Sequence, residues 1–126
     1  MSIKALLTKI LNRLVVGVIE TGYTNGWSYI KYSNGYVDAW YYNQFTISHY
    51  ATVNGFYAYL ISGLSLPFEM SDANYWIDTT WQISSGFTIR GSERRTTTQI
   101  VSLYALATAS GSQAVRINVH IYGKLA

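Results

Sequence analysis

The pattern of apolar and polar positions divides the chain into a short helical segment and a long strand-rich segment. Apolar side chains first recur at spacings of four, three and four residues, at Ile3, Leu7, Ile10 and Leu14. Because such spacing places side chains on one face of a helix, we expect a helix over residues 2–14 that is capped by Ser2 and ended by Gly17. After Gly17 the apolar period changes to two, which is typical of strands.

The four apolar positions of the predicted helix form a heptad seam with Leu at a and Ile at d, a choice that shifts coiled coils toward three or four strands. Two heptads are too short to hold as an isolated coil in water, so the seam needs an oligomeric body behind it. We therefore interpret residues 1–16 as an oligomerisation helix and residues 17–126 as a head domain. The alternative is an amphipathic helix that packs on its own domain.

Turn signals punctuate the chain after Gly17. The pairs Asn25-Gly26, Asn34-Gly35 and Asn54-Gly55 favour tight hairpin turns, because Asn and Gly accept positive φ. Several short strands with turns at regular intervals indicate a mainly β, antiparallel sandwich or barrel. We predict strands near residues 15–20, 27–32, 36–46, 55–61, 65–70, 75–84, 86–91, 97–107 and 114–123.

Two of these segments alternate clearly. In the last strand, Val and Ile at positions 115, 117, 119 and 121 form a core face, and the opposite face is polar. This polar face meets solvent or a neighbouring subunit, and we interpret Arg116 and His120 as residues of an interface near a symmetry axis. In residues 75–83 the same alternation places Trp76 on the wetter face.

Composition narrows the class of protein. A chain of 126 residues is long enough for one domain, and an apolar fraction of 49% excludes an intrinsically disordered chain. Twelve Tyr and four Trp against four Phe favour amphipathic rings, which suit half-buried faces and contact surfaces. The absence of Cys removes disulfides, thiolate metal sites and cysteine nucleophiles.

Charge and hydropathy indicate neither nucleic acid nor membrane as a partner. The net charge of +3 arises without a long run of either sign, whereas nucleic-acid footprints are broad cationic stripes. No apolar stretch approaches the roughly 20 residues that a membrane-spanning helix needs. Because Lys9, Asn12 and Arg13 interrupt the N-terminal segment, we interpret it as structural and not as a targeting signal.

Enzymatic groups are scarce in this sequence. His49 and His120 lie in separate predicted strands without metal-ligand spacing, and no P-loop, GxSxG or GxGxxG motif is present. The few carboxylates give no reason to choose a glycosidase pair. We predict no catalytic residue, no metal and no cofactor.

Groups suited to sugar binding are better supplied. Flat rings suit the C–H face of a pyranose, and planar polar groups suit its hydroxyls. Two segments combine such groups, with Asp72, Asn74, Tyr75, Trp76 and Asp78 in one and Arg90, Arg94 and Arg95 in the other. We predict a ligand site from these residues. Two alternatives remain open, because a Tyr-Trp pair also packs in cores and interfaces and because Arg90 can pair with Asp78.

The segment 22–40 resembles a known family. It reads GYTNGWSYIKYSNGYVDAW, similar to the pattern GxxGxWxYRKWSNGxAECW of tail-fibre or baseplate-associated proteins of phages and prophages of Gram-positive bacteria. The matching positions are Trp27, Tyr29, Lys31, Tyr32, Ser33, Asn34, Gly35 and Trp40. Downstream, Leu66-Pro67-Phe68 is similar to the family's aromatic-Pro-Phe strand. The segment VRINVHIYGK at residues 115–124 is similar to the family's closing strand.

The resemblance implies a C-terminal tail-fibre module, a β-sandwich assembled as a trimer and similar to the H-type lectins. With the predicted helix, this gives an antiparallel β-sandwich head and a short N-terminal helix forming a trimeric collar. In the hairpin of the motif, we expect Asn34-Gly35 to make the turn and Trp27, Tyr29 and Trp40 to pack across it.

Our first hypothesis is a virion protein of a phage tail, or a prophage product, that forms a homotrimer and binds a bacterial cell-surface carbohydrate. It would also contact other tail or baseplate proteins. The second hypothesis is a purely architectural tail or baseplate component that binds no sugar, and the third is a small glycan-cleaving enzyme.

Overall fold

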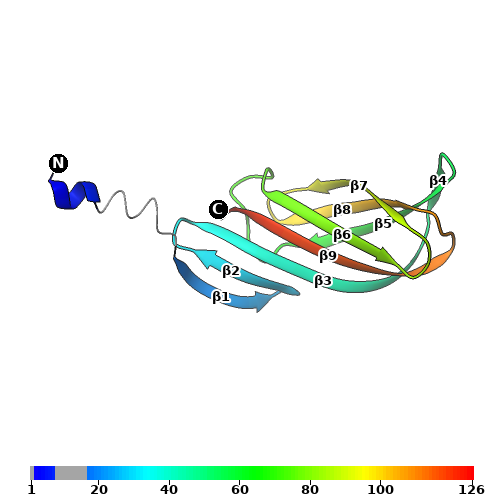
Figure 1. Ribbon diagram of the computed structural model, residues 1–126, viewed down its shortest axis with the longest axis horizontal. Helices are drawn as coiled ribbons and strands as arrows, with labels where there is room; N and C mark the ends of the chain where they lie inside the picture. The colour runs from blue at the N-terminus through cyan, green and yellow to red at the C-terminus, as the bar shows by residue number, and fades with distance from the viewer. Residues whose placement is uncertain (1, 8–16) are drawn as a thin grey trace.

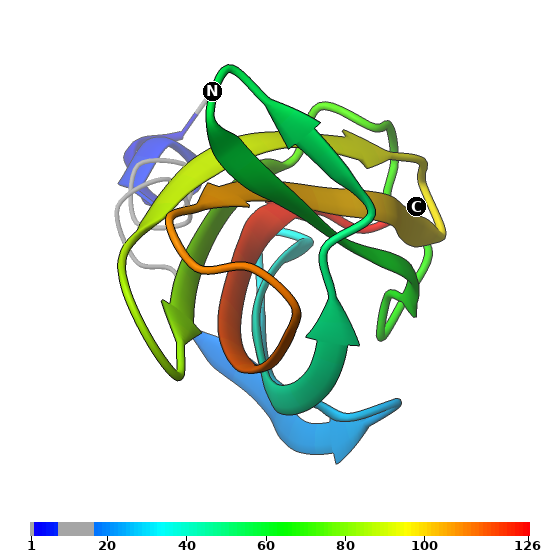
Figure 2. The ribbon, with the colours of Figure 1, turned by 90° about the vertical axis from the view of Figure 1, so that its right-hand side faces the viewer.

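The computed structural model describes residues 2–7 and 17–126, and nine strands lie within these ranges. The strands are β1 (Val18–Thr24), β2 (Trp27–Tyr32), β3 (Tyr36–Ser48), β4 (Ala51–Val53), β5 (Phe56–Ser65), β6 (Trp76–Ile83), β7 (Thr88–Arg95), β8 (Gln99–Ala107) and β9 (Ser112–Lys124). They form an antiparallel five-stranded sheet of order β1-β2-β3-β9-β6 and a four-stranded sheet of order β4-β5-β8-β7. The two sheets pack as a sandwich (Figures 1 and 2), which confirms the predicted fold class.

The core lies between the inner faces of the two sheets. β9 contributes four side chains that are each at most 1% exposed, Val115, Ile117, Val119 and Ile121. β6 adds Ile77 beside them, and its neighbour Trp76 points outward. The alternation predicted for both segments is therefore confirmed. Leu103 of β8 and Ile61 of β5 close the core from the four-stranded sheet.

The predicted Asn-Gly turns are present in two forms. Asn25 and Asn54 have φ of 53° and 50°, and the glycine after each is also at positive φ, as a two-residue type I′ turn requires. At the third turn only Gly35 has positive φ, and its N–H donates to the carbonyl of Tyr32 at 3.1 Å. This geometry is a type I turn followed by a left-handed glycine, the common three-residue hairpin.

Some strand predictions were wrong. The segment 66–70 forms no strand, because it departs from the sheet after Ser65 and bonds instead to the chain before β8, with the N–H of Leu66 donated to Thr98 and that of Met70 to Thr97. Pro67 cannot donate to a strand ladder. The short strand β4 was not predicted. Of the first predicted strand, residues 18–20 belong to β1, whereas residues 15 and 16 lie outside the described residues.

The rings of the β2–β3 hairpin divide between two faces. Trp27 is fully buried, and its Nε1–H donates to the carbonyl of Ser65 at 2.8 Å. Trp40 pairs with Ser28, one position along from Trp27, and lies on the outer face of the sheet with 40% of its surface exposed. The expectation that Trp40 packs with Trp27 and Tyr29 was wrong, because successive strand positions face opposite sides.

The N-terminal segment is helical at residues 3–7. The Ser2 hydroxyl accepts the N–H of Ala5 at 3.1 Å, which is the cap expected from the sequence. Ile3 and Leu7 are 79% and 54% exposed. Ile10 and Leu14 of the seam lie outside the described residues, so the contact between copies stays a prediction. Within the described ranges, no helix has the length and apolar character to cross a membrane.

We expect Trp27→Ala to lower the free energy of unfolding by about 3–5 kcal/mol, because it leaves a cavity and removes the donor to Ser65. Chemical denaturation followed by circular dichroism measures this change. Tyr23→Ala, at an exposed ring on the neighbouring strand, should change stability by less than about 0.5 kcal/mol. Equal effects of the two substitutions would contradict the placement of Trp27 in the core.

Candidate functional site

Aromatic side chains gather on the outer face of the five-stranded sheet. β9 pairs with β3 on one side and β6 on the other, and this register places Trp40, His120 and Asp78 in one row across the three strands. In the next row Trp76 pairs with Tyr122. We call this surface the aromatic face, and it comprises Tyr36, Trp40, Tyr42, Trp76, His120 and Tyr122.

His120 lies between two indole rings at the centre of the aromatic face. Its ring is nearly parallel to that of Trp40, with centroids 4.8 Å apart and planes at 13°, and it meets Trp76 edge to face at 4.9 Å and 79°. His120 Nε2 lies 2.7 Å from Oδ1 of Asp38, and the Tyr32 hydroxyl donates to Oδ2 at 2.7 Å. Both carboxylate oxygens of Asp38 thus hold groups of this face in place.

The same carboxylate perturbs the ionisation of Tyr32. Its hydrogen bond with Asp38, aided by burial and by the negative charge of Asp38, raises the pKa of Tyr32 above its ordinary value. Tyr32 therefore remains a protonated donor to Asp38 at neutral pH.

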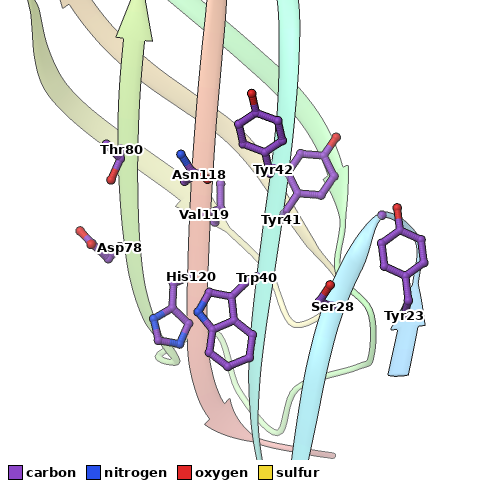
Figure 3. Close-up of a pocket in the computed structure, with 11 residues that line it drawn as sticks. Tyr23, Ser28, Trp40, Tyr41, Tyr42, Asp78, Thr80, Asn118, Val119 and His120 are labelled. Atoms are coloured by element: carbon purple, nitrogen blue, oxygen red, sulfur yellow. The ribbon is translucent and has the colours of Figure 1, made fainter. Parts of the chain in front are cut away.

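A groove of about 370 Å³ runs across the aromatic face (Figure 3). We call it the central groove. Aromatic rings and small polar side chains line this groove, among them Tyr23, Ser28, Trp40, Tyr42, Thr80 and Asn118. Asp78 lies at its β6 side. Rings beside hydroxyl, amide and carboxylate groups suit a ligand with both apolar and polar edges.

A second groove, of about 260 Å³, lies at the end of the aromatic face, and we call it the end groove. Four of the predicted ligand residues line it together, namely Asp72, Asn74, Tyr75 and Trp76. The N–H of Asn74 donates to Oδ1 of Asp72 at 2.7 Å, which fixes the loop before β6. Trp76 is 52% exposed, on the face predicted for it. The fifth residue of that predicted set, Asp78, lines the central groove instead.

Tyr75 and Arg95 are engaged with each other inside the molecule. The Tyr75 ring is 4% exposed, and its hydroxyl donates to the carbonyl of Thr96 at 3.0 Å. The Arg95 guanidinium lies 5.1 Å from the centre of this ring and donates to the Tyr75 carbonyl. Burial raises the pKa of Tyr75 to about 12, although the charge of Arg95 opposes this shift. Tyr75 therefore packs inside the domain, as the alternative interpretation of the Tyr-Trp pair predicted. Trp76 is the exposed ring of the pair.

The other two predicted cations lie on β7 of the four-stranded sheet. Arg94 pairs with Ser102 and borders a hollow on the outer face of the four-stranded sheet. Arg90 pairs through its backbone with Ala105 of that sheet, and its side chain is not among those described. Because β6 and β7 belong to different sheets, the strands themselves do not pair. The pairing of Arg90 with Asp78 stays a prediction.

The two interface residues predicted on β9 face outward from the sandwich. Arg116 donates from Nε to Oε1 of Gln44 at 3.1 Å, whereas His120 is held by Asp38. The two side chains thus have separate partners within the chain. Their role at a subunit interface stays a prediction.

Sequence reasoning missed Trp40, Tyr42 and Ser28 as residues of the candidate site. The signal was present, because alternation along residues 36–42 places Tyr36, Trp40 and Tyr42 on one face. What strand alternation alone does not show is that β9 brings His120 against this face.

The fold and the aromatic face together define a β-sandwich domain with open, ring-lined grooves. No protein-family profile matches the chain, and no curated protein matches it. Among solved structures, the fold is similar to that of an N-truncated R1-type pyocin tail fibre, with a TM-score of 0.53 and 11% identity over 92% of this chain and 94% of that one. It is also similar to a P. aeruginosa R1 pyocin fibre comprising C-terminal residues 323–701, with a TM-score of 0.51 and 12% identity. The match covers 92% of this chain and 31% of that fibre chain. At these identities the likeness concerns the fold.

We expect Tyr75→Phe to lower the free energy of unfolding at pH 7 by about 1 kcal/mol, because the hydrogen bond to Thr96 is lost. The native chain should also lose stability more steeply than Tyr75→Phe between pH 10 and about pH 12. A tyrosine whose folded pKa is raised to about 12 favours folding below its unfolded pKa and loses that contribution as pH rises through the folded value. Urea unfolding at fixed pH tests both points, and parallel pH profiles would contradict the buried position of the hydroxyl.

Proposed function

We propose that this chain is a structural, non-enzymatic tail-fibre module of a phage or phage-tail-like particle, and that it assembles as a homotrimer and binds a bacterial surface glycan. The observation that carries the binding role is the aromatic face with its two open grooves. The likeness to pyocin tail fibres and the resemblance of residues 22–40 to phage tail proteins support the proposal that the chain works in a phage tail or phage-tail-like particle.

The chemistry of the aromatic face suits a sugar. A pyranose offers an apolar C–H face that packs on an aromatic ring, and hydroxyls that need donors and acceptors. Trp40 and Trp76 supply exposed rings on either side of His120, and Asp72, Asn74 and Asp78 supply the polar groups. Because each site is open and shallow, useful affinity requires several copies, which a trimer provides.

The helical segment supports the trimer. Ile3, Leu6 and Leu7 are exposed within one chain, although apolar side chains of this size gain about 1.5–3 kcal/mol each on burial. Their burial between copies would hold three heads side by side. Other tail or baseplate proteins are further proposed partners.

We expect Leu7→Asp to weaken the trimer, because it places one carboxylate per chain in an apolar seam. Light scattering should give three subunits for the native chain at micromolar concentration and smaller species for the variant. Lys4→Asp, a change of charge on the same short helix outside the seam, is the matched control. A native chain that runs as a monomer overturns the assembly proposal.

We expect Trp76→Ala and Trp40→Ala each to weaken binding to bacterial cell-wall polysaccharide by about tenfold or more, since loss of an aromatic anchor costs about 2 kcal/mol. Both rings are exposed, so the melting temperature should change little. Phe87→Ala removes a 79% exposed ring away from the aromatic face and should bind normally. A microbial glycan array and a cell-wall pull-down measure the effect.

Two outcomes would overturn parts of this proposal. If the native protein binds no glycan and no cell wall, the architectural hypothesis replaces the binding role. If Trp76→Ala unfolds or fails to assemble, Trp76 packs within the assembly and does not belong to the ligand site.

A further inference from the structure

The outer face of the four-stranded sheet carries a hollow of about 500 Å³, across the sandwich from the aromatic face (Figure 2). We call it the arginine hollow. Arg94 of β7 pairs with Ser102 of β8, and Ser102 pairs with Ser62 of β5, so the register places the three residues in one row. Because directly paired residues of neighbouring strands share a face of the sheet, one guanidinium and two hydroxyls belong to the same surface. All three side chains line the hollow.

A β-bulge in β8 lies beside this row. The β8 partners of Arg94 and Arg95, which are adjacent, are separated by one extra residue, Val101. Strict alternation would turn Val101 and Ser102 toward opposite faces of the sheet. With the bulge, both of these side chains line the arginine hollow. Bulges are over-represented beside functional sites, where they re-aim side chains.

A second bulge, in β7, lies on the other side of the row. Here Gly91 and Ser92 together oppose the single residue Tyr104 of β8. The Tyr104 ring lies against the β7 backbone at Gly91, where a Cβ atom would collide with the ring. Tyr104 also meets Tyr50 edge to face, with ring centroids 6.3 Å apart. Because Ser92, Tyr104 and Tyr50 all line the arginine hollow, the irregular backbones of both strands shape one surface.

Arg94 gives this hollow a positive charge. Among the described residues that line it, Arg94 is the only charged one, and it forms no ion pair with any residue that the structure describes. Its neighbour Glu93 pairs with the buried Leu103 and therefore lies on the inner face of the sheet. A guanidinium stays protonated and presents five N–H donors in a fork that matches carboxylate and phosphate. The exposed side chain of Arg94 therefore suits an anionic group of a ligand.

The other groups of the hollow suit a sugar. Three serines line it, at positions 62, 92 and 102, and each hydroxyl both donates and accepts hydrogen bonds, as sugar hydroxyls require. Tyr50 and Leu60, which are 58% and 42% exposed, line the same hollow and offer apolar surface to the C–H groups of a pyranose. The volume of the hollow lies within the range of small-molecule sites.

We infer that the arginine hollow is a second ligand site, separate from the aromatic face, for an acidic sugar that carries a carboxylate or a phosphate. Arg94 pairs with the anionic group, and the three serines bond to the hydroxyls of the sugar. Tyr50 and Leu60 contact its apolar C–H groups. Binding here does not require the aromatic face, because the two surfaces belong to different sheets.

Matched small probes test the ligand class. The acidic sugars are methyl β-D-glucuronide and α-D-glucose 1-phosphate, with methyl β-D-glucoside as the neutral comparison and acetate as an anion without a sugar. Titration of the native protein followed by NMR reports affinity, and the backbone amide signals report the place of binding. We expect at least one acidic sugar to shift the amide signals of Ser62, Arg94 and Ser102. The glucoside and acetate should each bind at least tenfold more weakly, and the tighter acidic sugar identifies the preferred anion.

Arg94→Gln should weaken the binding of that acidic sugar at least tenfold, because the charge-assisted hydrogen bonds are lost. Lys4→Gln removes the same charge on the N-terminal helix and should bind within twofold of the native protein. Ser62→Leu provides a second route, because it fills the hollow without a change of charge, and it should also weaken binding at least tenfold. Ser65→Leu is its control, with the same change on the same strand outside the hollow, and should bind within twofold.

The outcomes separate this site from the aromatic face. An acidic sugar that binds Arg94→Gln and Ser62→Leu as tightly as the native chain overturns the site. So does one that shifts the indole signals of Trp40 and Trp76 and leaves the amide signals of the hollow unchanged. Equal binding of the glucoside overturns the need for an anion, and equal binding of acetate overturns the sugar. If neither acidic sugar binds the native protein, the arginine hollow is no such site, and glycan binding by the aromatic face still stands or falls with its own Trp variants.

Discussion

The register of β9 between β3 and β6 is the constraint on which both the core and the candidate site depend. β9 pairs with β3 over its whole length and with β6 over most of it, and its side chains alternate strictly between core and outer face. A slip of one residue against either neighbour would turn Ile117 and Ile121 outward and bring Asn118 and His120 into the core. The burial of four β-branched side chains therefore also positions His120 against Trp40.

The aromatic face stays ordered although it lies outside the core. Asp38 bonds to His120 and to Tyr32, two groups that come from different strands on either side of it. The stack of His120 on Trp40 then adds dispersion and fixes the direction of the indole. Rings held in this way lose little further entropy when a ligand packs on them, which favours binding by a shallow surface.

Much of this fold was readable from the sequence, because period-two alternation and Asn-Gly turns are local signals. The alternation of β6 and β9, and the outward position of Trp76, followed from it directly. Contacts between distant segments were not readable in this way, since Asp38 and His120 are 82 residues apart. Bulges add a further difficulty. Arg94 and Arg95 are adjacent, yet an irregularity between them pairs Arg94 with Ser102 and Arg95 with Ile100.

Alternation along β3 separates the positions that pack the core from the positions of the aromatic face. Val37 and Ala39 are fully buried. Asp38, which lies between them, and Trp40, the next residue, lie on the aromatic face. Substitutions at the outward positions can change the exposed surface while the buried positions keep the sheets packed, because only the buried positions carry large burial energies. A surface built in this way can vary its exposed side chains without a new fold. This offers a physical reason why a domain can share a fold with the pyocin fibres at 11% and 12% identity and still present a different set of side chains.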